Sequence, residues 1–132
     1  MRLGICAFLY ALTLGFSVQA ETPTLPADAV QLKGDDIAAY LDGKRFSTVI
    51  YDADAIINAT VNWDFKRGVV YGDFSMGETK GKFENPLTIK GNTTCGERTA
   101  KGALVCQKIF VSGSTMYEVN KAGQVHAVSK IK

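Results

Sequence analysis

Two hydrophobic periodicities divide the chain, and the first is helical. Ile37, Tyr40 and Leu41 are spaced at i, i+3 and i+4, which places them on one face of an α-helix. Gly34 or Asp35 can cap the start of this segment, whose first turn is acidic. The pattern predicts one short helix at the start of the folded region.

A period of two replaces the helical period after Gly43, which supplies the helix stop. In the clearest segment Ala59, Val61, Trp63 and Phe65 point one way, and the residues between them are mostly polar. Such alternation is typical of a strand with one face on a core and one in water. Further strands are predicted over residues 46–51, 69–76, 79–84 with a continuation through 87–89, 93–97, 103–111, 115–120 and 124–131.

Short polar turns separate these segments. Arg67-Gly68 predicts a tight hairpin connection, whereas Pro86 marks a bulge, an edge or a break, because proline cannot donate to a sheet ladder. The fold class is therefore mainly β (α+β). We expect a short N-terminal helix followed by a seven- or eight-stranded antiparallel meander forming a small barrel or sandwich, with the helix closing one end or packing on one face.

The first twenty residues have the pattern of an export signal. Arg2 is followed by an uncharged run from Leu3 to Val18, and small residues stand at Val18 and Ala20, where a signal peptidase cuts. The run is short for a membrane span, although an uncleaved anchor is the alternative. The predicted organisation is a signal peptide at 1–20, a flexible leader at 21–31 and a single β-rich domain at 32–132, located in the periplasm or outside the cell.

Charge argues against two classes of partner. The chain has 15 Lys+Arg and 13 Asp+Glu, and removal of Arg2 leaves 14 against 13, a net charge of +1. The charges are scattered, without the basic stripe that nucleic acid requires, and no Lys/Arg-rich amphipathic helix is present for anionic lipid. We expect no nucleic-acid partner and no membrane span after signal cleavage.

The cysteines predict one disulfide. Cys6 leaves with the signal peptide, so Cys95 and Cys106 remain as a pair on the two flanks of a polar loop. In an oxidising compartment such a pair is most simply a disulfide that staples a hairpin. A metal site would need two more ligands, and a redox pair usually reads Cys-x-x-Cys.

No catalytic constellation stands out. The single histidine, His126, falls in a mostly polar register and is interpreted as an exposed strand residue. No Gly-x-Ser-x-Gly elbow marks a nucleophile, and no calcium loop or phosphate cradle is complete. We predict no catalytic residue, cofactor or metal. The acidic residues most often solvate a surface, and nothing marks a facing pair among Asp52, Asp54, Asp64, Asp73, Glu78 and Glu84.

Aromatic residues are the more informative candidates. Their alternation with polar residues makes core filling the default, and a ligand pocket at a barrel mouth is the alternative. The candidates are Trp63, Phe65, Tyr71, Phe83, Phe110 and Tyr117, with Tyr51 and Phe74 beside them.

The order of several short segments resembles a family of small exported bacterial proteins of uncharacterised function. These segments are Leu32 to Ile37 with Leu41 and Gly43, Thr94-Cys95, Leu104 to Cys106, and Tyr117 to Asn120 ahead of Gly123. The resemblance implies a single helix with an antiparallel β-domain and a cysteine pair, and it supplies no catalytic residues. A looser similarity is to periplasmic lysozyme inhibitors, which are also small disulfide-containing β-domains.

The function expected from the sequence is that of an exported, non-enzymatic binding module that acts through its loops or barrel mouth. The partner is an unknown protein or a small apolar ligand in the cell envelope. The alternatives are an inhibitor of a cell-wall enzyme such as lysozyme and a small envelope hydrolase.

Overall fold

The structure is a computed structural model that describes residues 22–52, 55–97 and 104–132. The predicted signal peptide, residues 1–20, lies outside the described residues, as do residues 53–54 and 98–103. Within the described ranges one antiparallel sheet holds ten strands. They are β1 (Val30–Gln31), β2 (Arg45–Tyr51), β3 (Ile56–Asp64), β4 (Val69–Met76), β5 (Thr79–Pro86), β6 (Thr88–Lys90), β7 (Thr93–Glu97), β8 (Leu104–Ser112), β9 (Thr115–Val119) and β10 (Val125–Ile131).

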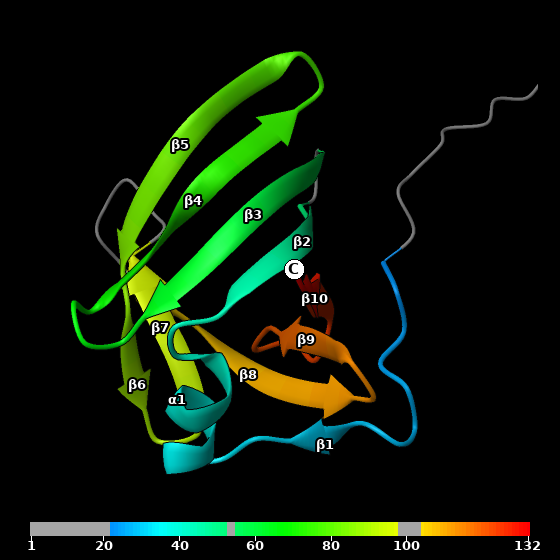
Figure 1. Ribbon diagram of the computed structural model, residues 1–132. Helices are drawn as coiled ribbons and strands as arrows, with labels where there is room; N and C mark the ends of the chain where they lie inside the picture. The colour runs from blue at the N-terminus through cyan, green and yellow to red at the C-terminus, as the bar shows by residue number, and fades with distance from the viewer. Residues whose placement is uncertain (1–21, 53–54, 98–103) are drawn as a thin grey trace, which may run out of the picture.

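Two runs of hairpins build the sheet and meet through one long-range pair. Strands β2 to β5 pair in chain order, and so do β6 to β10. Pairing of β2 with β10 joins the runs and gives the order β5-β4-β3-β2-β10-β9-β8-β7-β6. The sheet curls into a half-barrel (Figure 1), and the chain passes from the edge strand β5 to the edge strand β6 through Leu87 alone.

The predicted mainly β, antiparallel class is confirmed, but the predicted strand count is wrong. The interrupted unit that begins at residue 79 divides at Leu87 into β5 and β6. In addition, β1 forms at the end of the segment expected to be a leader, where Val30 pairs with Val111 of β8. Because β1 precedes the helix, the helix is not the N-terminal element.

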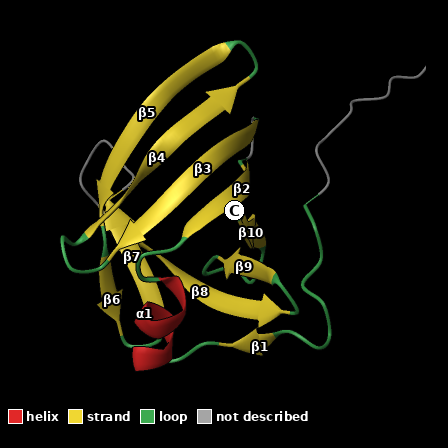
Figure 2. Cartoon of the chain, viewed as in Figure 1, coloured by secondary structure: helices red, strands yellow, loops and turns green. Residues whose placement is uncertain are grey.

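Helix α1 (Asp35–Leu41) covers one end of the half-barrel (Figure 2). Ile37 and Leu41 are completely buried and belong to the same hydrophobic cluster as Phe46 and Trp63. Burial of each such side chain contributes about 2 kcal/mol, which outweighs the low intrinsic stability of so short a helix. Gly43 follows with a φ of 73°, a left-handed conformation that favours glycine and ends the helix as predicted.

The side chains of β3 alternate between the two faces of the sheet as predicted. Ala59, Val61 and Trp63 are buried in the curl of the sheet. Phe65 lies just beyond the end of the strand and stacks on Trp63, with 6.3 Å between the ring centroids. The face that sequence periodicity assigned to the core is therefore the inner face of the half-barrel.

The disulfide is present between Cys95 and Cys106. The two residues are direct partners across β7 and β8, so the bond staples this hairpin as expected. The polar loop between the strands, residues 98–103, lies entirely outside the described residues.

Tyr40, on the helix, gives a pH-dependent prediction. Burial raises the pKa of its phenol above the ordinary 10.0, because the phenolate loses solvation. The folded state thus holds this proton more tightly than the unfolded state does. The contribution of the Tyr40 phenol to the free energy of unfolding is fully present below its pKa in the unfolded chain. This contribution is lost as the pH rises through its pKa in the folded state.

We expect Tyr40→Phe to lose less stability than the unchanged protein between about pH 8 and about pH 11, measured by urea unfolding. Tyr71→Phe is the control, because Tyr71 is exposed. Equal alkaline losses for Tyr40→Phe and the unchanged protein would contradict the assignment.

Candidate functional site

A cavity of about 400 Å³ lies inside the curl of the sheet. This volume falls in the range of about 300–1,000 Å³ that is typical of small-molecule sites. Residues from both hairpin runs line it, so the cavity depends on the junction between β2 and β10. The exposed residues Asp52 and Pro86 are part of the lining, and the cavity therefore reaches the surface.

One wall of the cavity is apolar and comes from β3, β4 and β5. Val61 and Trp63 of β3, Val70 and Phe74 of β4, and Phe83 of β5 all line the cavity. These positions share a face because they pair or alternate in register across the three strands. This wall offers aromatic and branched surface to whatever occupies the cavity.

The opposite side of the interior carries polar residues. Five buried polar side chains stand on five strands that are consecutive in the sheet, β2, β10, β9, β8 and β7, one on each strand. We call this set the polar row. Its members are Thr48, Ser129, Glu118, Gln107 and Thr94, in sheet order.

Strand register makes the polar row continuous. Thr48 pairs with Ser129, and their hydroxyl oxygens share a hydrogen bond of 2.7 Å. Gln107 pairs with Thr94 at the other end of the row. Glu118 stands between them, diagonal to Ser129 on one side and to Gln107 on the other. Of these five residues, Thr48, Glu118 and Thr94 line the cavity itself.

Two buried polar atoms have no hydrogen-bond partner among the described residues. They are the indole Nε1 of Trp63 and the amide Oε1 of Gln107. A buried donor or acceptor without a partner costs about 1–3 kcal/mol, so each requires an explanation. Trp63 lines the cavity and is only 5% exposed, so its ring is part of the cavity wall, whereas its Nε1 is fully buried.

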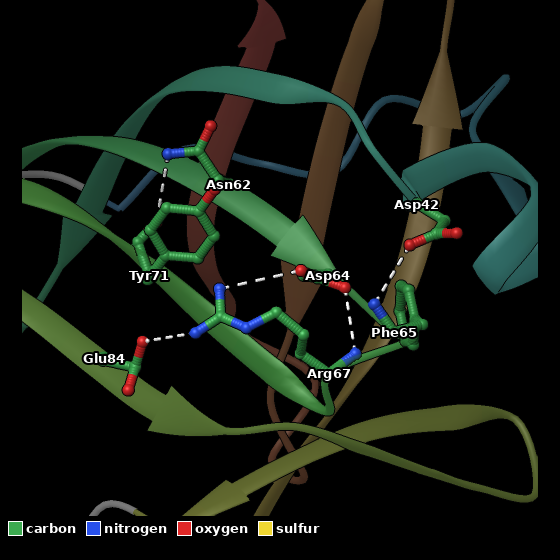
Figure 3. A network of polar contacts seen from close by, with 7 residues as sticks. All are labelled: Asp42, Asn62, Asp64, Phe65, Arg67, Tyr71 and Glu84. Atoms are coloured by element: carbon green, nitrogen blue, oxygen red, sulfur yellow. Dashed lines mark hydrogen bonds and ion pairs between the residues drawn. The ribbon is translucent and has the colours of Figure 1, made fainter.

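A network on the outer surface holds the β3–β4 turn in place (Figure 3). Arg67 donates from Nη2 to Glu84 Oε1 at 3.1 Å, and its backbone N–H donates to Asp64 Oδ1 at 3.0 Å. Asp42, just after the helix, accepts from the backbone N–H of Phe65 at 3.0 Å. Each exposed contact is worth little alone, but together they tie the helix, β3 and β5 around the segment that carries Trp63.

The structure brings only part of the predicted aromatic set to the cavity. Trp63 and Phe83 line it, together with Phe74. Phe65 packs against the hydrophobic core beside Trp63 and does not line the cavity. Trp63 and Phe83 both belong to or pack against the hydrophobic cluster and also line the cavity.

The other candidate aromatics lie away from the cavity. Tyr71 is exposed, and the Arg67 guanidinium lies 5.5 Å from the centroid of its ring. Phe110 and Tyr117 are partners across β8 and β9, on the face opposite to Glu118. Neither of them lines the cavity, so these three side chains are not ligand candidates there.

The expectation that His126 is an exposed strand residue is wrong. It is half-buried and lines the cavity. The reason is a register shift between Val125 and Ala127, which leaves His126 as an extra residue in β10. A bulge of this kind breaks the alternation on which the sequence interpretation relied.

Two carboxylates line the cavity, a position that the sequence did not indicate for either. Asp52, expected to solvate a surface turn, lines the cavity while remaining exposed. Glu118 was not among the candidates, yet it is only 6% exposed and lines the cavity. A charged residue between Tyr117 and Val119, in a strand whose other residues are uncharged, is the sequence signal that could have identified it.

In the described ranges no three His, Cys, Asp or Glu side chains gather in a way that could hold a metal ion. Over the same ranges, no helix has the length and apolar character needed to cross a membrane. The cavity is therefore the candidate site that the described structure supports best.

Comparison of the chain with protein-family models, with curated proteins and with solved structures gave no significant match.

Proposed function

We propose that this protein is an exported, non-enzymatic binding module that holds a small molecule with an apolar body inside the half-barrel. The cavity is large enough for such a ligand and has an apolar wall built from three strands. Burying the ligand against Val61, Phe74 and Phe83 supplies the main driving force, about 25 cal/mol per Å² of apolar surface.

The observation that carries the proposal is the aromatic surface of the cavity wall, to which Trp63 of β3, Phe74 of β4 and Phe83 of β5 contribute. Hydrophobic and aromatic side chains are the usual lining of pockets that enclose the apolar body of a small molecule.

Two features support the export part of the proposal. The first twenty residues have the charge, the apolar run and the small residues of a signal peptide. The Cys95–Cys106 disulfide is the kind of bond that persists in oxidising compartments. Detection of a chain that begins at Glu21 by mass spectrometry of the exported fraction tests this part directly.

The binding proposal is tested with 1-decanol, a neutral probe that has a long apolar body and one hydroxyl acceptor. The chain contains a single tryptophan, Trp63, so its fluorescence reports on the cavity alone. For protein purified from cells that express the full chain, we expect a saturable change in Trp63 emission as 1-decanol is added.

Filling the cavity is expected to abolish this response. Ala59 lines the cavity and is 8% exposed, so Ala59→Leu places three further carbons where the probe lies. We expect the affinity for 1-decanol to fall by at least about tenfold, since those carbons displace ligand contacts.

Asn58→Leu is the matched control, because Asn58 is exposed on the same strand and faces away from the cavity. It should bind 1-decanol as the unchanged protein does. A response that is absent in the unchanged protein, or equal in the two variants, would refute the proposed cavity.

A further inference from the structure

The charges of the cavity lining are one-sided. Two carboxylates, Asp52 and Glu118, line the cavity together with His126. No lysine or arginine is part of the lining among the described residues, although the chain has 15 Lys+Arg against 13 Asp+Glu.

Glu118 is placed to act on a ligand at short range. It is 6% exposed, and its register partners Ile109 and Ala127 are buried apolar residues. Electrostatic interactions are stronger in such surroundings than in water. Glu118 and His126 both engage other groups of the protein, but a carboxylate has about four acceptor positions and can serve a second partner.

The aromatic wall favours the same sign of ligand charge. Trp63, Phe74 and Phe83 all line the cavity. The faces of aromatic rings carry negative partial charge, so they attract an organic cation and disfavour an anion.

We propose that the ligand of the half-barrel cavity is a small organic cation, a protonated amine with an apolar body, whose ammonium group is recognised by Glu118 and Asp52. The apolar body lies against β3, β4 and β5, and the ammonium group faces the polar row. This inference rests on the proposed binding function and adds the chemical class of the ligand. Anionic amphiphiles of the same size are excluded by repulsion from the two carboxylates.

Three probes with the same ten-carbon chain test the charge preference: decylammonium, 1-decanol and decanoate. Their binding is measured by Trp63 emission at neutral pH and low salt, where the amine is protonated and the acid ionised. We expect decylammonium to bind at least about tenfold more tightly than 1-decanol, and decanoate to bind most weakly.

Two variants test whether Glu118 and Asp52 cause the preference for decylammonium. Glu118→Gln keeps the shape of the side chain but removes its charge, and we expect it to lower decylammonium affinity by about tenfold with little change for 1-decanol. Asp52→Asn is expected to have a smaller effect of the same kind, because Asp52 is exposed. Being exposed, Asp52 also provides a test that does not depend on folding of a buried variant.

Glu78→Gln is the control, because it removes one negative charge at an exposed position outside the cavity lining. It should leave all three affinities unchanged. Binding of decanoate as tightly as decylammonium, or an unchanged preference in both cavity variants, overturns the inference while the binding function stands. Failure of all three probes to bind refutes the binding function itself.

Discussion

Gly72→Ala is expected to destabilise the fold by at least about 3 kcal/mol, a large part of the total stability of a domain of this size. A Cβ added to Gly72 would overlap the backbone carbonyl oxygen of Thr60 on the neighbouring strand. Backbone cannot move aside as a flexible side chain can, so β3 and β4 would have to separate where Gly72 pairs with Val61. Urea unfolding followed by circular dichroism measures the loss.

Gly77→Ala is the matched control on the same hairpin. Gly77 has a φ of 61°, but its added Cβ would meet no atom within 4 Å. Its cost is that of a left-handed alanine, about 1–2 kcal/mol. Equal losses for the two variants would show that β3 and β4 accommodate the extra atom, contrary to the overlap described above.

Removal of the disulfide is the second large expected effect. The Cys95→Ala/Cys106→Ala double variant should lose about 3 kcal/mol, because the bond closes a loop between residues 11 apart in sequence and restricts the unfolded chain. The loss is read as a shift in the urea midpoint at unchanged slope.

Treatment of the unchanged protein with reductant should produce a similar loss, and reductant should not affect the double variant. Intact-mass measurement provides an independent check. Without reductant, neither Cys95 nor Cys106 should react with an alkylating reagent, and alkylation of both would contradict the bond.

Much of the fold could be predicted from local pattern. The helix, the alternation of β3 and the pairing of the two cysteines all depend on residues close in sequence, where periodicity and compartment arguments apply. The additional strands could not be predicted in the same way. β1 has only two residues, and its pairing with β8 is fixed by distant parts of the chain.

The candidate site was predicted less completely, for physical reasons. The aromatic side of the cavity could be anticipated because Trp63 and Phe83 are large and alternate with polar neighbours. The polar row could not, because it runs across five strands and exists only through their register. The sequence interpretation placed His126 on the wrong face, because a single extra residue in β10 shifts the alternation of side chains between the two faces of the sheet.

The pairing of β2 with β10 also determines when the fold can be completed. Hairpins within each run bring together residues that are near in sequence, but the Thr48–Ser129 hydrogen bond closes a separation of 81 residues. Such contacts form late, since the entropy of closing a long loop is lost before they stabilise the chain. The hairpin runs β2–β5 and β6–β10 can each form as the chain is synthesised. The interior between the two runs exists only once β10 has paired with β2.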